Sequence, residues 1–230
     1  MSRRYELLIF DWDGTLMDSI DRIVRCFRNA CTDVGVPAPA VPATRHVIGL
    51  GLAEAIEQLL PQEDAATRAR VVERYREHFL HLDHTAMPLY AGVRAGLERL
   101  AEHGYLLAVA TGKSRRGLAR VLEETGMAPL FVATRCADEA FSKPHPRMLE
   151  DLLAYTGQRA DAALMIGDTV YDLQMARAAA MDSLAVSYGV HARADLLAYA
   201  PRACLDSFEE VCRWLRPRAV TLTAAAVAAD

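Results

Sequence analysis

Two carboxylates, Asp11 and Asp13, stand one residue apart directly after the apolar run at residues 7–10. In an extended segment alternate side chains point the same way, so these two acids share one side while Trp12 faces the other. Carboxylates crowded into one pocket repel each other unless a cation binds between them or one of them is protonated. The local pattern therefore predicts a site for a metal ion or a proton.

A second acidic pair, Asp168 and Asp172, lies in the segment GDTVYD, which follows another apolar run. Three or four carboxylates at one place form a hard oxygen site, which suits Mg²⁺ better than zinc or copper. Lys143 and the hydroxyl of Thr111 are suitable groups for the remaining oxygens of a phosphoryl group. These residue types together predict a Mg²⁺ site that binds a phosphoryl group.

Short apolar runs must bring these side chains together, because most of the candidate residues directly follow one. The runs lie at residues 7–10, 106–110, 162–166 and 183–186, with a further candidate at 130–134. Branched and apolar runs of this length are typical of strands buried on both faces of a parallel sheet. Helical spacing fills the intervals, and Pro146 favours the start of a helix over residues 146–156. The alternation predicts an α/β fold with a doubly wound parallel-sheet (Rossmann-like) core, in which ligands bind at the carboxyl ends of the strands.

Residues 17–87 interrupt this alternation with helical patterns only. The patterns cover residues 20–34, with Asp18 as a candidate N-cap, then 52–60 and 63–82. About 70 residues of helix suit an inserted subdomain better than a loop. We therefore predict a catalytic core of residues 1–16 and 88–230, with a helical cap inserted over residues 17–87. The alanine-rich tail 217–230 is either an extra helix or a frayed end.

Composition and charge exclude several other classes of protein. The 230 residues are 52% hydrophobic and 24% charged, with a net charge of −4 and scattered basic residues, which argues against nucleic acid as a partner. No apolar run is long enough to cross a membrane, and the N-terminal segment lacks the features of a signal peptide, so we expect a cytoplasmic location. The five cysteines include no CxxC pair and are expected in the core. The oligomeric state stays open.

The segments DWDGTLMDS, ATGK, SKPHP and GDTVYD occur in this order, with the helical insertion after the first. Together they resemble the four motifs of the haloacid dehalogenase superfamily of phosphohydrolases. From about residue 5 to 215 the pattern is most similar to the phosphoglycolate phosphatase-like branch with a helical cap. The resemblance implies that Asp11 is the nucleophile that forms an aspartyl-phosphate and that Asp13 is the general acid and base. It also implies Mg²⁺ held by Asp11, the main-chain carbonyl of Asp13 and Asp168, with Asp172 orienting the site.

The same resemblance assigns the phosphoryl group to Thr111, with Gly112 beside it, and a charge-neutralising role to Lys143. In the cap, the segment TRHVIGLG is where relatives with a cap select their substrates, so Arg45 or its neighbour His46 could meet a distal anionic group. The alternative is that Arg45 is a solvated surface residue and the glycines only shape a turn. After Thr111, the segment KS either caps the next helix or touches the substrate, and the sequence does not separate these roles.

The sequence thus predicts a Mg²⁺-dependent phosphatase whose partner is a small phosphorylated metabolite, with phosphoglycolate as one candidate. Inorganic pyrophosphatase and sugar-phosphate mutase activities on the same scaffold stay open. Dehalogenation is disfavoured because Asp13 supplies an acid and base that cleavage of a carbon–halogen bond does not need. A receiver-like signalling module also phosphorylates an aspartate beside Mg²⁺, but the helical insertion and Asp13 favour turnover over storage of the phosphoryl group.

Overall fold

A single parallel sheet forms the centre of the molecule. The computed structural model describes residues 4–216, so the alanine-rich tail lies outside the described residues. Within that range the strand order is β3-β2-β1-β4-β5-β6. The strands are β1 (Leu7–Phe10), β2 (Leu106–Thr111), β3 (Ala133–Cys136), β4 (Ala163–Gly167), β5 (Asp182–Val186) and β6 (Cys204–Leu205). Because Phe10 pairs with both Val109 and Ile166, the carboxyl ends of β2, β1 and β4 meet side by side.

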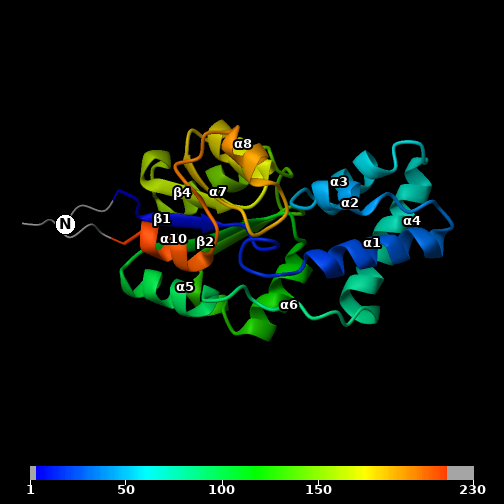
Figure 1. Cartoon of the computed structure of the whole chain (residues 1–230), viewed down its shortest axis with the longest axis horizontal. Coiled ribbons are helices and arrows are strands. Elements are labelled where there is room, and N and C mark those ends of the chain that lie inside the picture. Colours follow the sequence, from blue (N-terminus) through cyan, green and yellow to red (C-terminus); the bar gives the residue numbers. More distant parts are fainter. Residues whose placement is uncertain (1–3, 217–230) are drawn as a thin grey trace, which may run out of the picture.

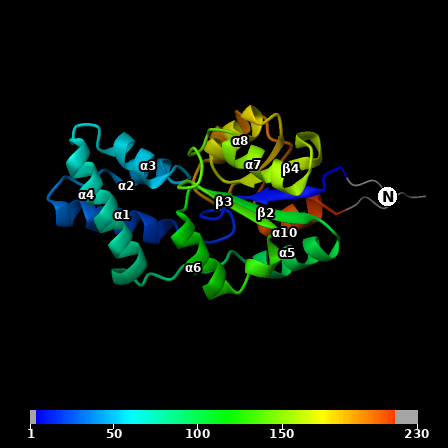
Figure 2. The ribbon, with the colours of Figure 1, turned by 180° about the vertical axis from the view of Figure 1, so that it is seen from behind.

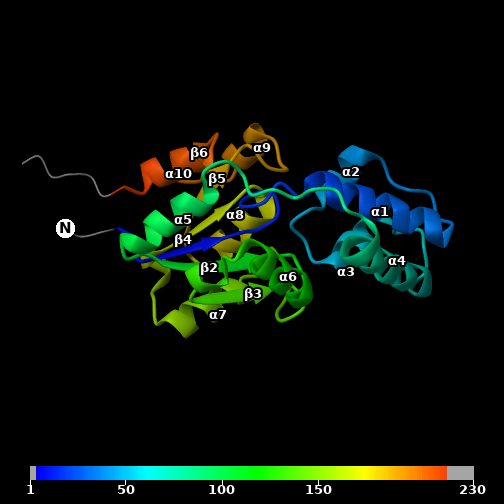
Figure 3. The ribbon, with the colours of Figure 1, turned by 90° about the horizontal axis from the view of Figure 1, so that it is seen from below.

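Helices cover both faces of this sheet, as the continuous apolar strands predict (Figures 1 and 3). Leu8 and Phe10 of β1 face one layer, and Leu7 and Ile9 face the other. The first layer contains α5 (Val93–Glu102), α6 (Arg115–Thr125) and α10 (Phe208–Trp214). The second contains α7 (Arg147–Thr156) and α8 (Val170–Ala178), with the short helix α9 (Arg193–Leu197) packed beside α8 and β5. The doubly wound fold is therefore confirmed.

A separate group of helices lies beyond the carboxyl ends of the strands (Figures 1 and 2). It consists of α1 (Ile20–Val34), α2 (Val41–His46), α3 (Leu52–Leu59), α4 (Ala65–Glu77) and a π-helical turn, η1 (His78–Leu82). Buried apolar side chains such as Phe27, Ile56 and Val71 give it a core of its own. The chain leaves and re-enters the sheet domain along two adjacent segments, since the N–H of Asp18 donates to the carbonyl of Pro88 at 2.8 Å. We call this group the cap.

Three local predictions were wrong. The strand expected at 130–134 begins at Ala133, because residues 128–130 form a 3-10 turn, η2 (Ala128–Leu130). This edge strand is only partly buried, so an apolar run in the sequence does not show where the strand begins. The N-cap of α1 is Ser19 and not Asp18. The helix expected over 63–82 is two elements, α4 and then the π-helical turn.

All five cysteines are buried and free, which confirms their expected place in the core. Among residues 4–216, no helix combines the length and the hydrophobicity that crossing a membrane requires.

Candidate active site

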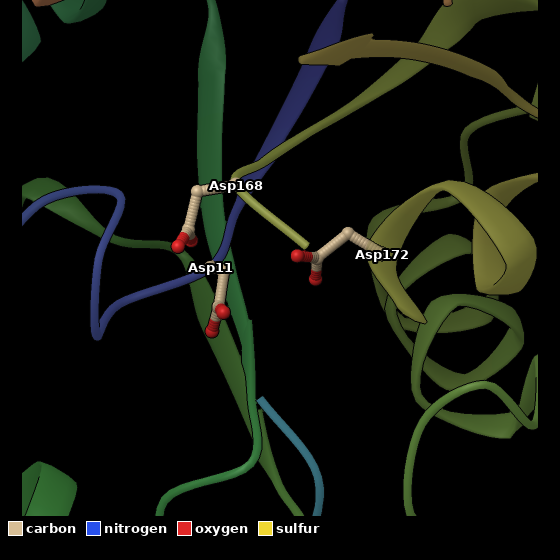
Figure 4. Close-up of side chains that lie close together, drawn as sticks. All are labelled: Asp11, Asp168 and Asp172. Atoms are coloured by element: carbon tan, nitrogen blue, oxygen red, sulfur yellow. The ribbon is translucent and has the colours of Figure 1, made fainter. Parts of the chain in front are cut away.

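Three acids meet where the central strands end (Figure 4). Asp11 follows β1, Asp168 follows β4, and Asp172 lies in the first turn of α8. One carboxylate oxygen from each residue lies within 4.8 Å of those from the other two, and all three side chains are buried. The sheet order therefore brings Asp11 next to two acids that lie more than 150 positions later in the sequence.

Local backbone geometry fixes Asp168 in this cluster. Its Oδ1 accepts a hydrogen bond from the Thr15 hydroxyl at 2.7 Å, and its Oδ2 accepts one from the N–H of Val190 at 2.8 Å. Gly14 and Gly189 leave the space that the carboxylate needs, because a Cβ on either would lie 2.2 or 2.3 Å from Asp168 Oδ2. Gly14 also has a φ of +84°, which an L side chain rarely adopts.

Asp172 and Lys143 form a fully buried ion pair next to Asp11. The hydroxyl of Thr169, the N-cap of α8, donates to Asp172 Oδ2 at 2.7 Å. The other oxygen, Oδ1, lies 2.7 Å from Lys143 Nζ, and the same ammonium lies 2.9 Å from Asp11 Oδ1. One buried cation therefore serves two buried carboxylates.

Burial and mutual repulsion shift the protonation of this group. Burial raises the pKa of Asp11 to about 7; the nearby Asp172 and Asp13 add to the rise, and Lys143 opposes it. Burial, followed by the charges of Asp11 and Asp172, raises the pKa of Asp168 well above its usual range. Burial disfavours the charged form of Lys143, but Asp11 and Asp172 outweigh it and raise its pKa. A single ammonium does not balance these acids, and a further cation would stabilise their ionised forms.

The donor set fits Mg²⁺. Asp11 Oδ1 accepts a hydrogen bond from the N–H of Trp12 at 2.7 Å, whereas Asp11 Oδ2 is buried and has no hydrogen-bond partner among the described residues. An unpaired buried carboxylate oxygen is costly. Coordination to a hard cation would satisfy this oxygen, and carboxylate oxygens are the ligands that Mg²⁺ prefers.

Asp13 lies beside this cluster with partners of its own. Its Oδ1 accepts a hydrogen bond from the Ser19 hydroxyl at 2.5 Å, and Lys113 Nζ lies 2.9 Å from Oδ1 and 2.8 Å from Oδ2. The same ammonium lies 4.6 Å from the centre of the Phe79 ring, which belongs to the cap. Ser114 caps α6 by accepting a hydrogen bond from a main-chain N–H. The sequence left the roles of Lys113 and Ser114 open. In the structure Lys113 contacts Asp13, whereas Ser114 caps the helix.

Thr111 and Gly112 complete the site. Thr111 is buried, with 1% of its surface exposed, and its hydroxyl accepts a hydrogen bond from the N–H of Lys113 at 3.2 Å. Gly112 lies against the cap, because a Cβ there would be 2.5 Å from the carbonyl oxygens of both Gly49 and Leu50. Both residues line a cavity of about 260 Å³ between cap and sheet, together with Asp11 and Asp13.

Arg45 and His46 lie outside this cavity lining. Arg45 is on α2, with 39% of its side chain exposed, and its guanidinium is 3.9 Å from Asp21. The His46 ring stacks on His191 of the sheet domain at 4.8 Å, and its carbonyl accepts a hydrogen bond from the Tyr171 hydroxyl at 3.1 Å. The structure does not bring Arg45 to the site, and its role toward the substrate stays a prediction without support from its position.

Residues 8–186 match the model of a protein family described as haloacid dehalogenase-like hydrolase. The chain belongs to this family. This hydrolase is 40% identical over 212 residues to the "probable phosphatase IndB" of Dickeya dadantii, covering 89% of this chain and 91% of the relative. It is 32% identical over 212 residues to a phosphoglycolate phosphatase of Aliivibrio fischeri, covering 89% and 93% of the two chains.

The fold of the hydrolase is shared with a crystal structure described as a predicted phosphoglycolate phosphatase from Haemophilus somnus 129pt. The TM-score is 0.83 at 22% identity, covering 94% of this chain and 100% of the other. The resemblance that the four motifs indicate is therefore confirmed. Ser19 and Thr15 also belong to the site, and both lie in the first motif, but their partners Asp13 and Asp168 become evident only in the folded chain.

Proposed function

We propose that this hydrolase is a Mg²⁺-dependent phosphatase that cleaves a small phosphomonoester through an aspartyl-phosphate on Asp11. The observation that carries the proposal is the buried cluster of Asp11, Asp168 and Asp172, in which Lys143 pairs with Asp11 and Asp172, next to the separate Asp13–Lys113 pair. Such a set suits a phosphoryl group accompanied by a divalent cation. The names of the two relatives above support the same class of reaction.

In this proposal Asp11 forms a bond to phosphorus while the bond from phosphorus to the ester oxygen breaks. The carboxyl of Asp13 gives its proton to the leaving oxygen and releases an alcohol. Asp13 then takes a proton from the water that attacks the aspartyl-phosphate, so that inorganic phosphate leaves and Asp11 is restored. Ser19 and Lys113 hold the Asp13 carboxylate in place for both proton transfers.

The remaining residues balance negative charge in the site and hold the phosphoryl group. Asp11, Asp168 and the main-chain carbonyl of Asp13 would hold Mg²⁺, which supplies positive charge to the phosphoryl oxygens when bound. Lys143 balances Asp11 and Asp172 from within the core. The hydroxyl of Thr111 donates to a phosphoryl oxygen. The expected partner is a small phosphorylated metabolite, and the expected location is the cytoplasm.

The test is release of phosphate from 4-nitrophenyl phosphate, with MgCl₂ and with EDTA, by the wild type and Asp11→Asn. We expect the variant to fold and to lose about a thousandfold or more in kcat. Asp161→Asn is the matched control, because Asp161 is exposed and pairs only with Arg159 on the surface among the described residues. An Asp11→Asn enzyme with near-normal kcat, or wild-type turnover that EDTA leaves intact, would refute the proposal.

Three further measurements separate the alternatives. Acid-quenched Asp13→Asn enzyme should carry one phosphoryl group on the peptide that contains Asp11, as detected by mass spectrometry. Pyrophosphate in the substrate panel tests pyrophosphatase activity, and isomer formation from a sugar phosphate tests mutase activity. Stoichiometric labelling of Asp11 without repeated turnover would favour the signalling module.

A further inference from the structure

The cavity above the proposed nucleophile has a floor and walls of different chemistry. Asp11, Asp13 and Thr111 lie at its floor, where the strands end. Its walls come mostly from the cap, with a smaller share from Lys113, Ser114, Gly117, Ala137 and Asp138 of the sheet domain, and are mainly apolar. The apolar wall residues include Ile23, Phe27, Ile48, Leu52, Tyr75 and Phe79. A phosphoryl group on the floor would therefore point its organic portion at hydrocarbon and aromatic surface.

Both cations of the cavity lining, Lys113 and Arg76, already have an acidic partner. Lys113 is already shared between Asp13, at 2.8 Å, and the ring of Phe79. Arg76 is 52% exposed and pairs with Glu73 at 2.5 Å. The other charged groups of the lining beyond the floor are acids, Glu54 and Asp138.

The size of the cavity suits a ring. A cavity of about 150 Å³ lined by apolar side chains is enough to hold benzene. The cavity here is about 260 Å³, which leaves room for a ring and a phosphoryl group. The carboxylate of phosphoglycolate, in contrast, would lose water against an apolar wall and gain no unpaired cation in return.

We propose that the substrate is the phosphomonoester of an uncharged alcohol with an apolar ring, and not an ester that carries a second anionic group. This inference rests on the proposed phosphatase function and names its substrate class. Selection comes from the cap wall, where an apolar leaving group is desolvated favourably and a carboxylate is not.

The experiment compares three esters that share a CH₂–O–P linkage, which are ethyl phosphate, phosphoglycolate and benzyl phosphate. With Mg²⁺ present, we expect kcat/KM for benzyl phosphate to exceed that for each of the other two by about tenfold or more. A kcat/KM for phosphoglycolate equal to or above that for ethyl phosphate overturns the inference. Equal values for benzyl and ethyl phosphate also overturn it, because the wall would then contribute nothing.

A designed cation in the wall provides an independent test. Ile23 lies one helical turn after Ser19, the hydrogen-bond partner of Asp13, so its side chain faces the same way as that of Ser19. Ile23→Arg should shift the ratio of kcat/KM toward phosphoglycolate by about tenfold or more, whereas Ile23→Met should keep the wild-type ratio. Melting curves identify a variant that fails to fold. In that case the three-ester comparison on the wild type still tests the proposed substrate class.

Binding of non-hydrolysable analogues separates failure of this inference from failure of the proposed function. If no ester is cleaved, calorimetry with the wild type and Mg²⁺ compares benzylphosphonate with phosphonoacetate. The absence of cleavage would reject the phosphatase proposal, and tighter binding of benzylphosphonate would still support the ligand preference. Equal or tighter binding of phosphonoacetate would overturn the preference as well.

Discussion

At the scale of single residues, Lys113 is the residue whose role the structure clarifies most. Its ammonium contacts both oxygens of Asp13 and reaches no member of the three-acid cluster in the ion pairs of the described residues. We therefore predict that Lys113→Met lowers kcat about 10- to 100-fold, because Asp13 loses the cation that orients it for proton transfer. Steady-state kinetics on any cleaved phosphomonoester measures the effect.

Lys113→Arg should recover part of the lost kcat, since a guanidinium can also pair with a carboxylate. Arg116→Met is the matched control, because Arg116 lies three residues after Lys113, in the first turn of α6, is exposed, and is not among the ion-pair partners of Asp13 in the described residues. A Lys113→Met enzyme that loses only affinity, with kcat intact, would show that Lys113 binds substrate instead of positioning Asp13.

The sequence predicted the acids of this site because Asp11 and Asp168 directly follow buried strands, Asp172 lies one turn beyond Asp168, and strand ends converge whatever the detailed packing. Asp11 and Asp168 needed only the correct sheet order, whereas Lys143 also depended on the loop between β3 and α7. The prediction for Arg45 depended on which way a short cap segment faces. That segment folds into the short helix α2 and turns Arg45 toward Asp21, and no periodicity signal in a six-residue helix could have indicated this.

At the scale of elements, contact between the cap and the sheet depends on the absence of a side chain at Gly112. A Cβ at this position would lie 2.5 Å from the carbonyl oxygens of Gly49 and Leu50, a separation that requires the cap loop to move. We predict that Gly112→Ala lowers kcat/KM about tenfold or more, because the cavity no longer closes over the floor. The melting temperature should change little, since the sheet itself is untouched.

Gly126→Ala is the control for this prediction. Gly126 ends α6 with a φ of +62°, and a Cβ there would meet no atom within 4 Å. The variant should lose about 1 kcal/mol of stability through backbone strain and keep its kcat/KM. Wild-type kcat/KM in Gly112→Ala would mean that this contact is not needed for turnover.

The positions of buried strands could be predicted from the sequence, and those of exposed edge strands could not. The strands β1, β2, β4 and β5 lie where their apolar runs placed them, because both faces of each are covered by helices. The edge strands were not predicted correctly, since β3 is only partly buried and β6 has only two residues. The helix α10 has a start signal in the sequence, because Ser207 caps it by accepting a hydrogen bond from the N–H of Glu210.

At the scale of the whole molecule, the acid cluster opposes folding when no cation is bound. The ordinary pKa of an aspartic acid is 3.8, and burial raises that of Asp11 to about 7 in the folded chain. Between these values the folded state holds more protons than the unfolded state, so the stability contribution of Asp11 falls as the pH rises through this window. Asp168, whose pKa is also raised, changes stability in the same direction.

Mg²⁺ should reverse this loss. A ligand that binds only the folded state, at a free concentration of about 100 times its Kd, adds about 2.7 kcal/mol to the free energy of unfolding. This corresponds to a rise in Tm of about 5–10 °C for a chain of this size. We predict a larger rise at pH 7.5 than at pH 5, because the carboxylates must be ionised to bind the metal. Differential scanning calorimetry with MgCl₂ and with EDTA at the two pH values measures it.

The variant Asp11→Asn separates the contribution of Asp11 to the pH and Mg²⁺ dependence of stability from that of other titrating groups. An amide nitrogen at the position of Oδ2 displaces no hydrogen bond, since that oxygen has no partner among the described residues. The variant lacks both a metal ligand and a group with a raised pKa, so its Tm should respond less to Mg²⁺ and its metal-free Tm should fall less between pH 5 and 7.5 than that of the wild type. Identical pH and Mg²⁺ responses in the two proteins would show that Asp11 is neither a ligand nor a source of the electrostatic strain, and that the cation binds elsewhere.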